Sequence, residues 1–280
     1  MHQRLDPLRC GTRYSGGVSR SILTVPVQKV DAGSSSQFQD LLAVEEPLEI
    51  RIGETTVSIT MRTPGQDAEL GLGFLFTEGI VASGAQIEHV ECAKNAVSVR
   101  LSPGVELDLA RLQRNFYTTS SCGVCGKASI EALRMQGCPV LPRESPVVSS
   151  VVIHGLPATL REDQRVFART GGLHGAALFD SDGRLLLARE DVGRHNAVDK
   201  LIGAEFLAGH IPLSDQVLLV SGRVSFELVQ KALMAGIPVL TAVGAPSSLA
   251  VETARRFNMT LLGFVRDGRF NIYSGAQRIQ

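Results

Sequence analysis

The second half of the chain repeats one pattern, in which a short apolar strand leads through a glycine-containing loop into a helix with one apolar face. The pattern predicts strands over residues 185–190, 216–220, 237–243 and 260–265, with helices over 197–208, 225–235 and 248–257 after the first three. Short apolar strands that alternate with helices favour parallel β-α-β connections, which place every strand-to-helix loop at one edge of the sheet. Because α/β proteins bind ligands at that edge, these loops are the first candidates for a binding site.

The first half of the chain predicts a smaller α+β unit. Two hairpins and one helix are expected, with strands over residues 48–52, 55–61, 90–93 and 97–101 and a helix over 67–78. The glycine- and serine-rich residues 31–36 are expected to form no regular structure. The predicted organisation is a partly flexible N-terminal arm over residues 1–45, a small α+β domain over 46–117, a connector loop over 118–127 and a larger α/β domain over 128–280.

The composition excludes several classes of protein. Of 280 residues, 28 are basic and 28 acidic, so no basic surface for nucleic acid is predicted. The N-terminus lacks the apolar segment of a secretory signal, and no run of 18 or more apolar residues occurs, so no membrane association is expected. The five cysteines are an odd number in a chain too large to need disulfides. These features indicate a soluble protein of the cytoplasm.

The loops at the predicted sheet edge resemble one another. Gly-Arg pairs occur at Gly193-Arg194 and Gly222-Arg223, Gly244 precedes Ser247-Ser248, and residues 171–174 form a further glycine-containing loop. Glycines let backbone N-H groups approach a ligand, helix N-termini favour phosphate, and arginines bind it bidentately. The set therefore points to a phosphate-rich ligand, although ordinary caps and turns with surface arginines explain each loop alone about equally well.

A metal site in the same region is not predicted. Asp191, His195 and Asp199 lie close together in the sequence, but they offer a single histidine. We expect a solvated histidine or one that bonds the polar edge of a ligand.

Cys122 and Cys125 form a Cys-x-x-Cys pair that glycines bracket and that stands just before a helix-like run from Lys127 to Met135. A helix N-terminus and a nearby lysine favour the thiolate, so the pKa of such a thiol falls from about 8.5 to roughly 3.5 to 7.5. The pattern predicts reactive cysteines rather than buried ones.

Four roles for this pair are open on the residues alone. A structural zinc site needs two more ligands, and a thioredoxin-like dithiol normally follows the first strand of a β-α-β unit. A zinc-dependent deaminase would use an H-x-E motif, which His89 and Glu91 supply, but Ser121 stands where the motif's proline belongs. The fourth role is a sulfur carrier, because an exposed thiolate accepts a sulfane sulfur as a persulfide.

Five motifs in order resemble the FdhD family, the sulfur-carrier accessory proteins of formate dehydrogenase. They are Ser121–Lys127, Thr170–His174, Glu190–Ala197, Ser221–Glu227 and Ala245–Ala250. The resemblance runs from about Glu46 to Tyr273. Gly175 stands where the family pattern leads us to expect alanine, and Gly244 where it leads us to expect serine.

The resemblance implies a cytoplasmic protein of the sulfurtransferase type that works through a covalent persulfide. It would take sulfur from a cysteine desulfurase and pass it to the molybdenum cofactor, Mo-bis(molybdopterin guanine dinucleotide), before that cofactor enters formate dehydrogenase. Cys122 resembles the persulfide-bearing cysteine and Cys125 its neighbour. The resemblance also implies a homodimer and a larger domain with the three-layer α/β/α fold of cytidine deaminases, without their zinc chemistry.

The family's cofactor-binding segment maps onto Phe264, Val265, Arg266, Asp267, Gly268 and Arg269. The cofactor carries pyrophosphates and guanines, which suits several Gly-Arg loops better than one phosphate pocket, and GDP or GMP would mimic it. The expected edge contacts are Gly172, His174, Arg194, His195, Ser221, Gly222, Arg223, Ser247 and Ser248. A cofactor-binding chaperone without sulfur transfer, and a deaminase-like enzyme, are the alternatives.

Overall fold

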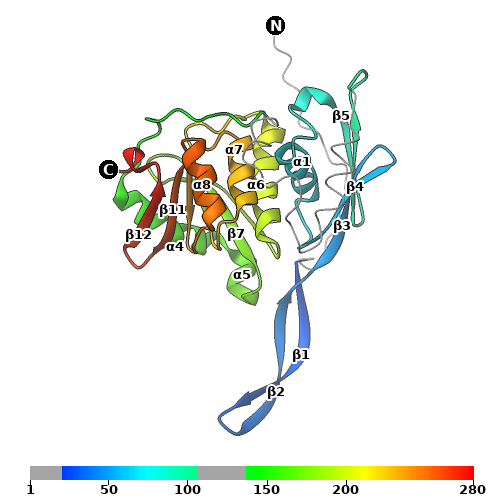
Figure 1. The fold of residues 1–280 in the computed structure, drawn as a ribbon. Coiled ribbons are helices and arrows are strands. Elements are labelled where there is room, and N and C mark those ends of the chain that lie inside the picture. Colours follow the sequence, from blue (N-terminus) through cyan, green and yellow to red (C-terminus); the bar gives the residue numbers. More distant parts are fainter. Residues whose placement is uncertain (1–20, 106–136) are drawn as a thin grey trace.

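A computed structural model describes residues 21–105 and 137–280 and shows a mixed α/β fold built on two main sheets (Figure 1). The larger sheet has six strands in the order β12-β11-β10-β9-β7-β8. The strands are β7 (His174–Phe179), β8 (Leu185–Asp191), β9 (Val217–Val220), β10 (Val239–Ala242), β11 (Thr260–Arg266) and β12 (Arg269–Ser274). The prediction of a mixed α/β fold is confirmed.

The strand directions correct the prediction that the connections are all parallel, and they confirm the prediction that the strand-to-helix loops share one edge. Strands β9, β10 and β11 are parallel, but β7 runs antiparallel to both β8 and β9, and β12 runs antiparallel to β11. The connection from β8 to β9 therefore crosses over β7. The sequence pattern did not predict β7. Because β8 still runs in the same direction as β9 to β11, the carboxyl ends of all four strands lie at one edge, as predicted.

Helices cover both faces of this sheet. One face carries α4 (Ser150–Asp163), with α5 (Arg165–Thr170) beside it, and the other carries α6 (Arg194–Ala208), α7 (Phe226–Met234) and α8 (Ser248–Arg256). Neighbouring strand residues point to opposite faces: Leu218 packs in the cluster with α6 to α8, and Leu219 in the cluster with α4. Strands buried on both faces need uninterrupted apolar sequence, which is why these segments read as apolar runs.

The smaller sheet has four strands in the order β4-β3-β6-β5. It contains β3 (Glu46–Ile52), β4 (Thr55–Arg62), β5 (Ile87–Ala93) and β6 (Ala96–Leu101), with α1 (Asp67–Thr77) on its inner face. Both predicted hairpins are present as antiparallel pairs, β3 with β4 and β5 with β6, and the predicted helix is present as α1.

The two sheets share one hydrophobic core, because α1 packs directly on α6. Gly73 of α1 and Gly203 of α6 form the contact. An ideal Cβ at Gly203 would stand 1.9 Å from the carbonyl oxygen of Glu69, and one at Gly73 would stand 1.9 Å from that of Asp199. The backbones of the two helices touch at this point, and a side chain on either glycine would push them apart.

The N-terminal arm differs from the prediction in residues 31–36. Strands β1 (Ile22–Asp31) and β2 (Ser34–Ala43) form a two-stranded antiparallel ribbon that extends away from the rest of the fold (Figure 1). Its turn consists of Ala32 and Gly33, with φ angles of 43° and 93°. Alanine rarely adopts a positive φ, so the sequence gives a weak hairpin signal here. Within the described ranges, no helix is both long enough and apolar enough to span a membrane.

Candidate functional site

Three helix N-termini meet at the edge where β8, β9 and β10 end. Arg194 is the first residue of α6, Ser225 precedes α7, and Ser247 caps α8 by accepting a hydrogen bond from the backbone N-H of Ala250 at 3.2 Å. The unpaired N-H groups and the dipoles of such helices favour anions. The edge thus has the electrostatic character expected of a phosphate site.

Backbone hydrogen bonds join the loops of this edge. The N-H of Gly244 donates to the carbonyl of Gly222 at 3.0 Å, and the N-H of Phe264 donates to the carbonyl of Gly244 at 3.1 Å. The Ser221 hydroxyl accepts from the N-H of Gly175 at 2.9 Å. A Cβ at Gly244 would stand 2.8 Å from the Gly222 carbonyl oxygen, so the serine of the family pattern would require a shift of the backbone in this chain.

His174 and Arg194 both lie close to Gly222. A Cβ at Gly222 would stand 3.4 Å from His174 Nδ1 and 3.9 Å from Arg194 Cδ, so glycine keeps the space between them open. Burial and the Arg194 charge lower the pKa of His174, while Asp191 opposes that shift. The Nε of Arg194 is buried and has no hydrogen-bond partner among the described residues. An unpaired guanidinium N-H beside helix N-termini fits an oxyanion ligand.

The C-terminal segment forms the β11–β12 hairpin at the same edge. Phe264 has a φ of 56°, and the turn residues Asp267 and Gly268 have φ angles of 54° and 68°. Arg266 is exposed, with its guanidinium carbon 6.0 Å from the centre of the Phe264 ring, and Arg269 is exposed as well. Val265 is fully buried in the core, so only its backbone can meet a ligand.

The other predicted residues fall into three groups. Arg223, Ser247, Ser248 and Gly172 are exposed on the edge loops. Cys122 and Cys125 lie outside the described residues. His89 and Glu91 lie on strand β5 of the smaller sheet rather than on a helix, and within residues 21–105 and 137–280 no group of three or more His, Cys, Asp or Glu side chains could hold a metal ion.

A cavity of about 490 Å³ adjoins the edge on the face that carries α4 and α5. Gly172, His174 and Ser221 line it, so it brings together three residues that the sequence singled out. Arg161 and Phe167 line the same cavity, with the Arg161 guanidinium carbon 4.0 Å from the centre of the Phe167 ring. Sequence reasoning missed both residues because it did not predict α4 and α5. A cation stacked on an aromatic ring is a surface on which a planar base can also stack.

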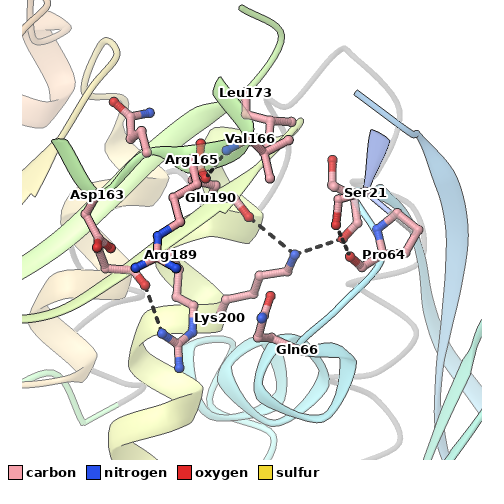
Figure 2. Close-up of a pocket in the computed structure, with 13 residues that line it drawn as sticks. Ser21, Pro64, Gln66, Asp163, Arg165, Val166, Leu173, Arg189, Glu190 and Lys200 are labelled. Carbon is pink, nitrogen blue, oxygen red and sulfur yellow. Dashed lines mark hydrogen bonds between the residues drawn. The ribbon is translucent and has the colours of Figure 1, made fainter. Parts of the chain in front are cut away.

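A second cavity, of about 290 Å³, lies between the loop that precedes α1, helix α6, strand β8 and the α4–α5 junction (Figure 2). Two of its lining residues carry buried polar atoms without a partner among the described residues, Thr63 Oγ1 and Gln164 Nε2. Gln164 lies against Gly175, where a Cβ would stand 2.7 Å from its Nε2. The departure from alanine at Gly175 thus makes room for Gln164.

Thr63→Val is expected to stabilise the protein by roughly 1 kcal/mol, because it removes an unpaired buried hydroxyl and keeps the shape of the side chain. Thr241→Val is the matched control, since the fully buried Thr241 hydroxyl donates to the Leu218 carbonyl at 3.0 Å, and its loss is expected to destabilise. Urea unfolding measures both. A loss of stability in Thr63→Val comparable to that of Thr241→Val contradicts the prediction.

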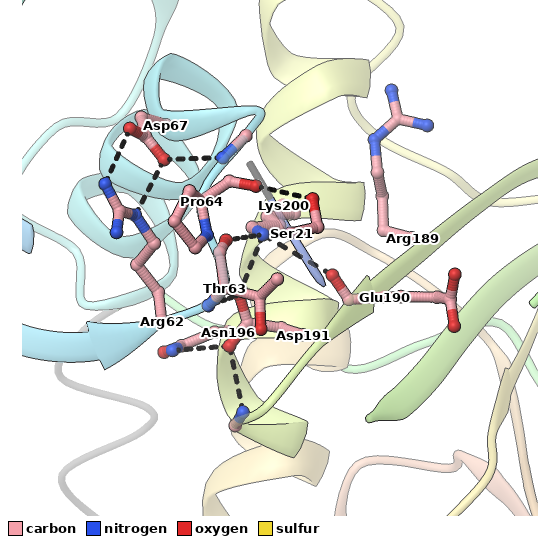
Figure 3. A network of polar contacts seen from close by, with 12 residues as sticks. Ser21, Arg62, Thr63, Pro64, Asp67, Arg189, Glu190, Asp191, Asn196 and Lys200 are labelled. Carbon is pink, nitrogen blue, oxygen red and sulfur yellow. Dashed lines mark hydrogen bonds and ion pairs between the residues drawn. The ribbon is translucent and has the colours of Figure 1, made fainter. Parts of the chain in front are cut away.

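Asp191 stands at the centre of a polar network that fixes the first edge loop (Figure 3). Its carboxylate lies 2.7 Å from the Lys200 ammonium and accepts hydrogen bonds from the N-H groups of Gly193 at 2.8 Å and Thr63 at 3.2 Å. The Asn196 amide also donates to it, at 2.9 Å. Asp191 is fully buried and Lys200 nearly so, which assigns Asp191 a structural role.

Comparison with known proteins finds the same family that the sequence motifs resemble. Residues 43–280 match the model of the FdhD/NarQ family. A protein of Streptomyces coelicolor named "Sulfur carrier protein FdhD" is 51% identical over 90% of this chain and 94% of its own length. A protein of the same name from Sulfolobus acidocaldarius is 43% identical over 92% of this chain and 98% of its own length.

A solved structure shares the fold. It is that of a putative formate dehydrogenase accessory protein from Desulfotalea psychrophila, with a TM-score of 0.75 and 23% identity over 92% of this chain and 99% of that one. The family match and the relatives together cover the six-stranded sheet, its edge loops and the smaller sheet. The chain therefore belongs to the FdhD/NarQ family.

Proposed function

We propose that this chain is a sulfur carrier required for formate dehydrogenase activity, and that it acts in the cytoplasm as a homodimer. The observation that carries the proposal is its identity of 43 to 51% with proteins named as sulfur carriers, over about nine tenths of the chain. The Cys-x-x-Cys pair supplies a thiol for the sulfur, and the glycine- and arginine-rich edge supplies a place for a recipient.

In the proposed first step, the Cys122 thiolate attacks the outer sulfur of a persulfide on a cysteine desulfurase. A new S–S bond forms between Cys122 Sγ and the sulfane sulfur, the old S–S bond breaks, and the desulfurase cysteine leaves as a thiolate. No external oxidant is needed, because the sulfane sulfur passes between two thiols at the same oxidation level. Cys125 assists or resolves the transfer, and its attack on the Cys122 persulfide would release sulfide and close a disulfide.

The recipient in this proposal is Mo-bis(molybdopterin guanine dinucleotide), bound as a client at the sheet edge. Its pyrophosphates would meet the N-termini of α6, α7 and α8 together with Arg194 and Arg223. The cavity beside His174 and Phe167 has a volume in the range of small-molecule sites, which suits a guanine base. We propose further that the six-stranded sheet and its two helical layers correspond to the cytidine deaminase fold without its zinc chemistry.

The decisive experiment is incubation with a cysteine desulfurase and cysteine, followed by mass spectrometry of the intact protein. Wild type and Cys125→Ala are expected to gain one sulfur at Cys122, and Cys122→Ala is expected to gain none and to leave formate dehydrogenase inactive. Cys138→Ala is a matched control, because burial raises the pKa of the Cys138 thiol to about 12 and makes it unreactive. Sulfur loading of Cys122→Ala together with active formate dehydrogenase would refute the assignment.

The two alternative functions, a cofactor-binding chaperone and a deaminase, predict different results for the same purified proteins. A chaperone that only binds the cofactor predicts that both cysteine variants stay active and cofactor-bound. A deaminase predicts stoichiometric zinc in the purified protein, which elemental analysis measures.

The variant Arg223→Ala tests whether sulfur transfer at Cys122 and ligand binding at the sheet edge are separate roles. Arg223 is exposed on the loop after β9, so its loss is expected to weaken GDP binding and leave persulfide formation at the wild-type level. Calorimetric titration with GDP and mass spectrometry of the persulfide give the two readouts. Equal loss of both contradicts separate roles.

A further inference from the structure

The ribbon of β1 and β2 carries an exposed apolar face (Figure 1). Residues that pair directly across two strands point to the same side, and Leu23 with Leu42 and Val27 with Phe38 are two such pairs on one face. Leu23, Phe38 and Leu42 are 55%, 43% and 44% exposed. Because a two-stranded hairpin alone is at best marginally stable in water, a ribbon with such a face is expected to pack against further protein.

The strand register shows which main-chain groups of the ribbon point outward. Asp31 and Ser34 flank a two-residue turn, so they form a hydrogen-bonded pair, and hydrogen-bonded and non-hydrogen-bonded pairs alternate from there. Pro26 and Gln39 then form a non-hydrogen-bonded pair, whose main-chain groups point away from the partner strand. The position of Pro26 agrees with this alternation, since proline has no N-H to donate within the ladder.

The two free edges of the ribbon differ in their capacity to accept another strand. The edge of β1 is interrupted by Pro26, which offers no N-H group. The residues of β2 with outward N-H and C=O groups are Ser35, Gln37, Gln39 and Leu41. The first three of these are exposed, and Ser34–Ala43 contains neither proline nor lysine, the residues that commonly protect an edge. Strand β2 therefore presents the edge that can pair with a further strand.

Strand β2 of a second copy fits this edge. In an antiparallel pairing centred on Phe38, the outward groups of Gln37 meet those of Gln39 of the second copy, so both sets of main-chain groups are satisfied. The two Phe38 side chains then face each other at the two-fold axis. Each is flanked by Val27 of its own copy, which gives one apolar row across four strands.

The charges of the ribbon favour the same register. Asp40 then stands opposite Ser36 of the second copy, and Ser36 is paired in its own copy with Lys29. Because serine is short, the Lys29 side chain can extend past it toward the Asp40 carboxylate. A pairing centred on Asp40 would instead set two carboxylates opposite each other, which is unfavourable. The Lys29 contact lies at the exposed rim, so it selects the register and adds little to stability.

We propose that two copies of this chain join along β2 into a four-stranded antiparallel sheet centred on Phe38. The inference rests on the homodimer of the proposed function and names its interface. The antiparallel arrangement places the two main bodies at opposite ends of the joined ribbons, so each copy keeps its own sheet edge free for a ligand.

Sedimentation velocity of the full chain compares Gln37→Pro with Gln28→Pro as its matched control. These two residues pair with each other and both have outward N-H groups, so neither proline removes a bond between β1 and β2. Only Gln37→Pro removes a donor from the β2 edge. Each copy loses one hydrogen bond, at about 2- to 12-fold in affinity, so the Kd of the dimer is expected to rise about 5- to 150-fold. Gln28→Pro is expected to dimerise as wild type does.

The outcomes separate this interface from the proposed function. A dimeric wild type whose Kd is unchanged in Gln37→Pro overturns the inference and leaves the homodimer standing. A monomeric wild type refutes both, and the sulfur-loading experiment on Cys122 tests the carrier role independently. Circular dichroism spectra that match wild type show that the proline variants are folded.

Disulfide cross-linking tests the register without a proline. A non-hydrogen-bonded antiparallel pair holds its Cα atoms about 4.5 Å apart, within the range of a disulfide. With Cys122 and Cys125 replaced by alanine, Phe38→Cys is expected to form a covalent dimer in oxidised glutathione. Val30→Cys is the control, since Val30 is 73% exposed but lies on β1, away from the axis. Equal cross-linking of the two variants, or none in Phe38→Cys, contradicts the pairing.

Discussion

Replacement of Gly203 by alanine is expected to destabilise the protein by at least about 3 kcal/mol, at the upper end of the cost of overpacking a core. The added methyl group would stand 1.9 Å from the Glu69 carbonyl oxygen and 2.8 Å from the Gly73 nitrogen. Both are backbone atoms, so no change of rotamer relieves the clash and α1 must move away from α6. That movement opens the core that joins the two sheets.

Thermal unfolding followed by circular dichroism measures the effect. For a chain of this size, 3 kcal/mol corresponds to a decrease in Tm of about 6 to 12 °C. Gly155→Ala is the matched control, because Gly155 lies on the exposed side of α4 and a Cβ there meets no atom within 4 Å. It is expected to gain up to about 1 kcal/mol from helix propensity. Equal Tm values for the two variants would contradict the close helix contact.

Lys200→Met is expected to destabilise the protein by about 3 to 5 kcal/mol, the usual cost of leaving a buried charge without its partner. Asp191 is fully buried and Lys200 is 1% exposed, with 2.7 Å between the ammonium nitrogen and a carboxylate oxygen. The Lys200 ammonium also donates to the backbone carbonyl of Thr63 at 2.9 Å. Because Asp191 holds the loop before α6, weaker GDP binding is expected together with the lower stability.

The double variant Asp191→Asn with Lys200→Met tests the cause. Removal of both charges is expected to cost less than removal of Lys200 alone, since no unpaired carboxylate remains. Lys29→Met provides an exposed comparison: Lys29 and Asp31 are 3.8 Å apart and 59% and 72% exposed, so its loss is expected to change stability by less than about 0.5 kcal/mol. Urea unfolding of the three variants gives the values. A double variant less stable than Lys200→Met would contradict this account.

Local sequence signals predicted the strands that are buried on both faces and the hairpins with a glycine in the turn. Strands such as β9 and β10 are buried on both faces, so their sequences are apolar throughout, and the hairpin of β3 and β4 has a glycine in its turn. Helix α4 gave no such signal, because Pro157 lies inside it and ordinarily ends a helix. The direction of β7 depends on its pairing with β9, which lies about 40 residues away in the sequence, and no local pattern encodes that pairing.

The candidate site was predictable to a similar extent. Gly-Arg loops at the ends of apolar strands predicted an edge, and the structure brings His174, Arg194 and Gly222 together there. Phe167 was missed, because α5 is only six residues long and has no apolar period. Val265 was expected to contact the ligand, but its side chain is in the core, since neighbouring residues on a strand point to opposite faces.

The hydrogen bonds that run from Gly222 through Gly244 to Phe264 use only main-chain atoms. The contour of this part of the edge, from Gly222 to Phe264, is therefore set by the register of the sheet, and the exposed side chains beside it add chemistry without supporting its shape. In such an arrangement the affinity for a ligand depends on exposed side chains, whereas the path of the loops depends on main-chain hydrogen bonds. Exchange of the exposed residues Arg223 and Ser248 is therefore expected to change the affinity of the proposed site for a ligand and to leave the stability of the fold unchanged.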